Sequence, residues 1–258
     1  MLKNLPIATR TLIIVNVGIF ILTMLLSSME VVELDVIFGS YYPESINFQF
    51  WQPFTHMFIH AGIGHLLFNM LALFIFGSTV EYHLGTKRFL ILYFVAGMGS
   101  FILFNAQSYF TIEPLKNAIE YVDIRSIVGF NAQLTPEIIN ENIQLDHFGR
   151  ATVPSFFNTV PEIIALVQAY ITPMMGASGA IYGVLVAFGF LFPNTGLSLV
   201  FIPYPIKAKY FIPGLIGLEI ILGLMNLSWN PVAHFAHIGG AVAGFALVYY
   251  WKKRGVIY

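Results

Sequence analysis

The stretch Met174–Gly183, with the sequence MMGASGAIYG, lies in one of the most apolar parts of the chain and places one hydroxyl group between glycines. A membrane helix can use such small residues to pack closely against a neighbouring helix. A hydrolase can use the same residues, here Gly176 and Gly179, to leave room around a nucleophilic serine. The question raised by this stretch is therefore which of these two uses applies to Ser178.

The composition indicates a membrane protein. The chain has 258 residues, of which 57% are hydrophobic and only 10% are charged, and its mean hydropathy is +0.77. Soluble domains are about 45–50% apolar and about 25% charged. The absence of cysteine excludes disulfides and thiolate metal sites. A net charge of −1 gives no indication of nucleic-acid binding.

Six segments are apolar enough to cross a bilayer, which needs about 20 residues per helix. They are residues 11–27, 64–82, 88–106, 174–192, 209–226 and 233–251. The first follows a basic start like that of a signal peptide but lacks a small-residue cleavage site, so we interpret it as an uncleaved span. The predicted fold class is an all-α polytopic membrane protein with six transmembrane helices.

The basic residues fall mainly on one side of this topology. Nine of the twelve do so, namely Lys3, Arg10, Lys87, Arg88, Lys207, Lys209, Lys252, Lys253 and Arg254. The other three, Lys116, Arg125 and Arg150, fall on the opposite side. The positive-inside rule then places both termini in the cytoplasm. The compact chain favours a prokaryotic plasma (inner) membrane.

The domain prediction is a single membrane domain over residues 1–258, with residues 107–173 forming an extended extracytoplasmic insertion. Within this insertion, the sequences TPE from Thr135 and TVPE from Thr159 are typical helix starts. The second start leads into PEIIALVQAY, which is apolar enough to lie at the membrane interface. No internal repeat is seen, and no strand alternation is long enough for a separate domain.

A histidine and two glycines share one face of the sixth predicted span. His237, Gly240 and Gly244 are three and seven residues apart, which places them on the same side of a helix. Glycines four apart allow another backbone to approach closely. If that backbone belongs to the helix that begins at Ser178, an imidazole meets a hydroxyl, which is the pairing that activates a serine nucleophile.

Other polar side chains are predicted at the same membrane depth, where such groups often mark function. Tyr182 lies one turn after Ser178 and can pack its ring on His237. His65 and Asn69 are four residues apart on the second predicted span, and both can donate hydrogen bonds to an oxyanion. The Ser178 backbone N–H, at a helix N-terminus, adds another donor.

Three motifs carry a resemblance to a known family: HMFIHAGIGHLLFN, GASGAIYG and AHIGGAVAG. With them, the chain resembles the rhomboid family of intramembrane serine proteases from about residue 11 to residue 251. The resemblance implies a six-helix core in which Ser178 is the nucleophile and His237 is the general base, a dyad without an aspartate. It also implies that His65 and Asn69 are oxyanion donors and that Tyr182 stacks on the histidine.

Further roles follow from the resemblance alone. Glu81 corresponds to an acid that holds helices together near the inner end of the second span. His56 and His60 correspond to structural histidines of the first outer loop, which is expected to lie partly in the outer leaflet. The family often has Trp-Arg in this loop, whereas this chain has Trp51-Gln52, so the anchoring of the loop is open. The insertion could cover the site, steer substrate or bind a partner.

Alternatives remain for these residues. Taken singly, Ser178 and the glycines could serve packing alone. His56 and His60 have zinc-ligand spacing, but Met57 stands where a zinc protease would need glutamate, and no carboxylate is near His234 or His237 in sequence. Glu219, inside the fifth span, is either protonated or paired with an unidentified polar group, and no catalytic role is assigned to it.

The predicted function is that of an intramembrane serine endopeptidase that cleaves transmembrane segments near the outer membrane face. Its expected partners are transmembrane protein substrates and membrane lipid, with no nucleic acid. The mechanism requires neither a metal nor an organic cofactor. The alternatives are a rhomboid-like protein that binds clients without cleaving them and, less favoured, a histidine-metal membrane protein. Substrate identity and oligomeric state are not predicted.

Overall fold

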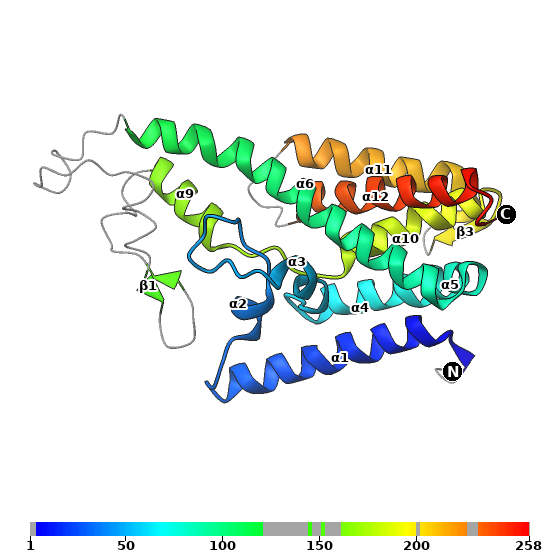
Figure 1. The fold of residues 1–258 in the computed structure, drawn as a ribbon, viewed down its shortest axis with the longest axis horizontal. Helices are drawn as coiled ribbons and strands as arrows, with labels where there is room; N and C mark the ends of the chain where they lie inside the picture. Colours follow the sequence, from blue (N-terminus) through cyan, green and yellow to red (C-terminus); the bar gives the residue numbers. More distant parts are fainter. Residues whose placement is uncertain are drawn as a thin grey trace, which may run out of the picture. The chain divides into compact units, whose positions relative to one another are not determined.

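The computed structural model describes residues 4–120, 144–145, 151–152, 161–199, 202–225 and 232–257, and most of them are helical (Figure 1). Its contacts divide the chain into two compact units. The first unit comprises residues 1–20, 57–104 and 176–258, and the second comprises residues 21–56 and 105–175. The helix start predicted at Thr135 and the basic residues Arg125 and Arg150 lie outside the described residues. The single domain expected from the sequence stays a prediction.

Within the described part of the chain, four helical stretches are long and apolar enough to cross a membrane. They are α1 (Ile7–Ser28), the stretch Ile63–Leu84, residues Thr86–Asn117 of α6 (Thr86–Glu120) and α11 (Ala208–Met225). The second stretch consists of α4 (Ile63–Ala72), a π-helical turn η3 (Leu73–Gly77) and α5 (Ser78–Leu84). The chain is therefore a polytopic helical protein.

The other two predicted spans are helices of different character. Helix α10 (Ser178–Leu191) is apolar but has only 14 residues, a length of about 21 Å against a hydrocarbon core of about 30 Å. Helix α12 (His234–Lys253) has 20 residues and ends at Lys252 and Lys253. A helix of this length is too short to cross the apolar layer from one face to the other.

Some predicted boundaries differ from the structure. Helix α6 continues to Glu120, well past the predicted end at residue 106, because the polar residues after 104 end the apolar pattern but remain compatible with helix. Helix α9 (Pro161–Ile171) begins at the predicted proline. Strands β3 (Gly196–Leu199) and β4 (Ile202–Lys207) form an antiparallel hairpin that the all-α prediction did not contain.

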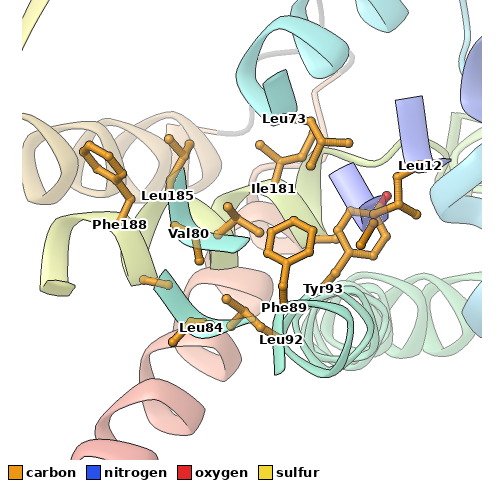
Figure 2. Close-up of a cluster of buried hydrophobic side chains, with 14 of the residues drawn as sticks. Leu12, Leu73, Val80, Leu84, Phe89, Leu92, Tyr93, Ile181, Leu185 and Phe188 are labelled. Atoms are coloured by element: carbon orange, nitrogen blue, oxygen red, sulfur yellow. The ribbon is translucent and has the colours of Figure 1, made fainter. Parts of the chain in front are cut away.

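Helix α10 lies at the centre of the first unit. It contacts α12, α11, η3, α5 and α4, and Figure 1 shows α10, α11 and α12 side by side. Buried apolar side chains from α1, η3, α5, α6 and α10 form the core around it (Figure 2). The labelled members are Leu12, Leu73, Val80, Leu84, Phe89, Leu92, Tyr93, Ile181, Leu185 and Phe188. This packing fixes the helix that carries Ser178.

Glu81 joins three helices of the first unit, namely α1, α5 and α6. Its carboxylate accepts the backbone N–H groups of Ala8 and Thr9 at 2.9 and 2.7 Å, and the Thr86 hydroxyl at 2.8 Å. The first N–H groups of a helix have no partner within the helix, so a carboxylate there satisfies them and interacts well with the helix dipole. The contacts are those of a residue that holds helices together.

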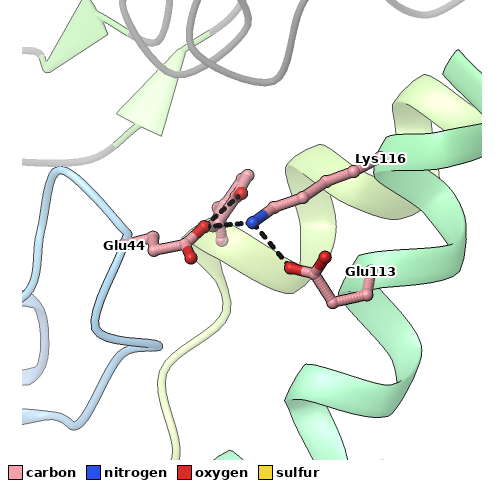
Figure 3. Close-up of polar contacts among 4 residues, drawn as sticks. Glu44, Glu113 and Lys116 are labelled. Carbon is pink, nitrogen blue, oxygen red and sulfur yellow. Dashed lines mark hydrogen bonds and ion pairs between the residues drawn. The ribbon is translucent and has the colours of Figure 1, made fainter. Parts of the chain in front are cut away.

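The second unit joins the two segments that the sequence predicts to be outer. It contains the helices α2 (Leu34–Phe38), α3 (Gln52–Thr55) and α9. It also contains the strands β1 (Gln144–Leu145) and β2 (Ala151–Thr152), which pair with each other. Ser40 and Met174 exchange backbone hydrogen bonds of 2.8 and 2.7 Å. Lys116 on α6 forms ion pairs with Glu44 and Glu113 (Figure 3). Lys116 and Met174, at the two ends of the predicted insertion, are thus attached to the predicted first outer loop by charged and backbone contacts.

Gln52 occupies the loop position at which the resemblance raised the question of anchoring. Its side chain is fully buried. Its Nε2 donates to the carbonyl groups of Asn47 and Ile37 at 2.8 and 3.3 Å, and its Oε1 accepts the N–H of Tyr41 at 3.3 Å. An amide supplies both donors and acceptors, so it can satisfy backbone groups of both kinds within one loop.

Candidate active site

Helices α10 and α12 touch backbone to backbone. A Cβ atom added at Gly240 would lie 1.9 Å from the carbonyl oxygen of Gly179, and one added at Gly244 would lie 2.6 Å from the Cα of Gly183. Only glycine therefore fits at these positions. This is the packing that the shared face of His237, Gly240 and Gly244 predicted, and it brings the start of α12 to the start of α10.

The close packing places His237 on Ser178. The Nε2 atom of His237 lies 2.8 Å from the Oγ atom of Ser178, a hydrogen bond in which the hydroxyl can donate to the imidazole. The ring of Tyr182 stacks on the imidazole, with ring centroids 4.3 Å apart and an interplanar angle of 7°. A nucleophile, a base within hydrogen-bond reach and a group that orients the base are the arrangement of a serine hydrolase.

Possible oxyanion donors surround the turn before α10. Gly176 has a φ of +118°, which side-chain-bearing residues rarely adopt, and an added Cβ would lie 2.7 Å from Nε2 of His65. The same Cβ would lie 3.7 Å from Nδ2 of Asn69, a buried amide nitrogen that has no hydrogen-bond partner among the described residues. Both predicted donors thus lie against the backbone two residues before Ser178.

The N-terminus of α10 adds backbone donors. Ala177 is the N-cap residue and provides no side-chain hydrogen bond to the helix. The first N–H groups of an α-helix lack partners within the helix, and the helix dipole makes this end favourable for negative charge. The N–H of Ser178 is one of these groups, so the arrangement is suited to stabilising an oxyanion beside the hydroxyl.

The two histidines predicted for the first outer loop have different surroundings. His56 is buried in the 3-10 turn η2 (His56–Phe58), where its Nδ1 lies 3.0 Å from the carbonyl oxygen of Gln52. His60 packs its ring against that of His65, with centroids 5.1 Å apart at 65°. Burial lowers the pKa of both His56 and His60 to about 4, so both are neutral near pH 7.

Glu219 is the residue whose partners sequence reasoning could not identify. It lies on α11 and is only 8% exposed. One carboxylate oxygen accepts a hydrogen bond from the Tyr182 hydroxyl. The other, Oε2, lies 2.5 Å from Nδ1 of His234 and 3.1 Å from Nδ1 of His237. The only sign of these contacts in the sequence is a carboxylate within an apolar helix, and no motif relates Glu219 to the histidines of α12.

The same three side chains have the composition of a metal site. The ligand atoms of Glu219, His234 and His237 all lie within 4.8 Å of one another. Two histidines and one carboxylate form a known zinc ligand set. The sequence argument against a metal, that no carboxylate lies near these histidines, therefore does not hold in three dimensions.

The fold and this site define a helical membrane protein in which a serine and a histidine from two tightly packed helices form a hydrogen bond. The family model of the rhomboid domain matches residues 47–115 and 152–254. The chain thus belongs to the rhomboid family, as its motifs predicted, and it is an integral membrane protein.

Relatives agree with this assignment. An uncharacterized mitochondrial rhomboid protein of Schizosaccharomyces pombe is 29% identical over 219 residues, 81% of this chain and 53% of that protein. The rhomboid protease AarA of Providencia stuartii is 27% identical over 92% of this chain and 69% of its own length. Rhomboid protein 1 of Saccharomyces cerevisiae mitochondria is 23% identical over 88% and 64%. The chain spans about half the length of the first relative.

Proposed function

We propose that this chain is an intramembrane serine endopeptidase of the rhomboid type. The observation that carries the proposal is the 2.8 Å contact between Ser178 Oγ and His237 Nε2, with Tyr182 stacked on the imidazole. Because a serine hydroxyl is weakly acidic, it attacks a carbonyl only when a base removes its proton. The relative from Providencia stuartii is named a rhomboid protease, which supports the same activity.

The mechanism uses the dyad twice. Ser178 Oγ forms a bond to the scissile carbonyl carbon while its proton moves to Nε2 of His237. The resulting tetrahedral intermediate collapses, the C–N bond breaks, and His237 returns the proton to the leaving amine. Water then attacks the acyl-enzyme with His237 again as the base, which releases the carboxylic acid and regenerates the Ser178 hydroxyl.

The oxyanion of each tetrahedral intermediate is stabilised by His65, Asn69 and the N–H of Ser178. Two observations support this assignment: the amide nitrogen of Asn69 has no hydrogen-bond partner in the described part of the chain, and His65 approaches Gly176. Removing one such donor in a serine protease costs roughly 10²–10³-fold in kcat. Gly176 and Gly179 act as space-making residues around the nucleophile, and Gly240 and Gly244 bring the base to it.

The proposed substrates are transmembrane segments of other proteins. Helix α10 is too short to cross the apolar layer by itself, so Ser178 is reached from within the membrane, at the end opposite the basic residues Lys252 and Lys253. In a six-span arrangement that includes α10 and α12, both termini lie on the inner side and cleavage occurs near the outer face. Weak helix formers such as glycine in the substrate ease its unwinding.

A second candidate is a metal-dependent protein, which the cluster of Glu219, His234 and His237 favours. A metal bound there would be held by Glu219, His234 and His237 and would supply Lewis-acid activation of a water molecule. A rhomboid relative that binds clients without cleaving them is disfavoured, since both members of the dyad are present and in contact.

Cleavage of a single-span substrate reconstituted in liposomes distinguishes these functions. The proposal predicts that the wild type cleaves with or without a metal chelator, and that Ser178→Ala and His237→Ala show no cleavage while melting like the wild type. Cleavage that persists in Ser178→Ala and is lost on chelation would establish the metal-dependent function. Substrate that co-purifies with the wild type but is never cleaved would establish client binding.

A further inference from the structure

Glu219 touches the side of the catalytic histidine that faces away from the serine. Nε2 of His237 meets Ser178 Oγ at 2.8 Å, and Nδ1 of the same ring lies 3.1 Å from Oε2 of Glu219. An imidazole that takes a proton at Nε2 must already carry its other proton at Nδ1. Glu219 is therefore placed where an acceptor selects the tautomer that the reaction needs.

The carboxylate is held in place by two neighbours. The Tyr182 hydroxyl donates to one oxygen, and the ring of the same residue stacks on His237. His234, one helical turn before His237, lies 2.5 Å from the other oxygen. A charged group within an apolar helix is costly unless it is paired. The groups that pair with Glu219 here, Tyr182 and His234, are also neighbours of the catalytic histidine.

The contact between Glu219 and His237 is an ion-pair contact rather than an aligned hydrogen bond. Nδ1 of His237 has no partner among the described residues that meets hydrogen-bond geometry, although Oε2 of Glu219 is 3.1 Å away. Catalytic hydrogen bonds are often poorly aligned before substrate binds and tighten as the reaction proceeds. In the proposed reaction His237 becomes an imidazolium as it takes the Ser178 proton, and its attraction to the Glu219 carboxylate is strongest at that point.

Resting on the serine-protease function proposed above, we infer that Glu219 is a positioning residue that extends the dyad to a Ser178–His237–Glu219 triad. Its carboxylate orients the imidazole, favours the tautomer with the proton on Nδ1, and stabilises the imidazolium beside the tetrahedral intermediate. The resemblance to rhomboid proteases implied a dyad without an acid, so this group is an addition. It acts through His237 and does not touch the substrate.

The chain contains a matched control for this inference. Glu81 is also a buried glutamate that accepts several hydrogen bonds, but its partners are the start of α1 and the Thr86 hydroxyl. Glu81→Gln should lower the melting temperature and leave kcat, measured well below the melting temperature, within about threefold of the wild type. Glu219→Gln keeps the shape of the side chain and removes the charge that faces His237.

The test measures kcat and KM for substrate cleavage, and the rate at which a fluorophosphonate labels Ser178, each per unit of folded protein. Loss of the acid of a catalytic triad lowers kcat by roughly 10⁴-fold in well-studied proteases. Glu219 is not aligned with His237 before substrate binds, so we expect a smaller effect here. Glu219→Gln should lower kcat and the labelling rate at least tenfold, with little change in KM. Glu219→Asp should recover part of the loss, because it restores the charge.

The outcomes separate the two proposals. A loss below tenfold in Glu219→Gln, or losses equal to those of Glu81→Gln, would overturn the triad and leave the serine protease intact. If Glu219→Gln fails to fold, a Glu219→Asp protein that folds but is inactive would also overturn the triad. A wild type that neither cleaves nor labels at Ser178 would overturn the proposed function and the triad together.

Discussion

The backbone of Gly240 meets the carbonyl oxygen of Gly179 so closely that an added Cβ would lie 1.9 Å from it. The contact joins two backbones, so no rotation of a side chain can relieve an added methyl group. Since Ser178 is next to one of these glycines and His237 is one turn from the other, the geometry of the dyad depends on the contact.

Replacing Gly240 with alanine should therefore disturb both stability and chemistry. Overpacking of this kind costs about 1–3 kcal/mol, and a displacement of about 1 Å between reacting groups can cost roughly 10²-fold in rate. We expect Gly240→Ala to lower the melting temperature and to reduce kcat at least tenfold. Gly214→Ala, on α11 with open space around it, is the matched control and should change neither. Equal activity of the two variants would contradict the proposed packing.

The stacking of the Tyr182 ring on His237 can be tested separately from the hydrogen bond that the Tyr182 hydroxyl donates. Tyr182→Phe keeps the ring that lies 4.3 Å from the imidazole but removes the hydrogen bond to Glu219. Tyr182→Ala removes both, so that no ring packs on the face of the His237 imidazole. We expect steady-state kcat to fall about threefold to tenfold in the first variant and roughly 10²-fold in the second. The idea that the ring orients the base fails if the two losses are the same.

Gln52 should be essential to the first outer loop. Gln52→Ala leaves the N–H of Tyr41 and the carbonyl groups of Ile37 and Asn47 without this partner. A buried polar group left unsatisfied costs about 1–3 kcal/mol. We expect a lower melting temperature and faster proteolysis of the loop. Gln107→Ala, at an exposed amide on α6, provides the comparison, and identical melting curves would refute the anchoring role.

Acid should destabilise the loop through His56. Burial lowers its pKa to about 4 in the folded protein, against an ordinary value of 6.5 for histidine. The unfolded chain therefore binds more protons between these values, and stability falls as the pH is lowered through this window. The full effect is no more than about 3 kcal/mol. We expect thermal midpoints to decrease from pH 7 to pH 4.

The matching variant is His56→Gln, which does not titrate in this range. Its thermal midpoint should depend less steeply on pH than that of the wild type. His60, whose pKa burial also lowers to about 4, contributes to the slope that remains. A His56→Gln protein with the same pH dependence as the wild type would show that His56 is not the group responsible.

The face of α12 that carries His237 could be predicted from a local pattern, whereas its pairing with Ser178 was implied by the resemblance to rhomboid proteases. Glycines at 240 and 244 mark a face for backbone contact, and the histidine lies on that face. The position of Tyr182, one helical turn after Ser178, follows from the same helical periodicity. Residues that share one helix face, such as His65 and Asn69, were likewise placed by spacing alone.

The partners of Glu219 could not be predicted, since they depend on how α11 is rotated against α10 and α12. Hydrophobic periodicity gives little information on rotation when a helix is apolar on nearly all sides. The hairpin of β3 and β4 was missed for a different reason, because its strands are short and irregular in register. The continuation of α6 to Glu120 was missed because hydropathy detects the apolar part of a helix and not its end.

The most direct test of the central claim is to locate the covalent adduct that a fluorophosphonate forms with the protein in native membranes. Peptide mass spectrometry should find the phosphonyl group on Ser178 in the wild type and no adduct in Ser178→Ala or His237→Ala. An adduct on another residue, or labelling of Ser178 that does not depend on His237, would contradict the account of an activated serine at the start of α10.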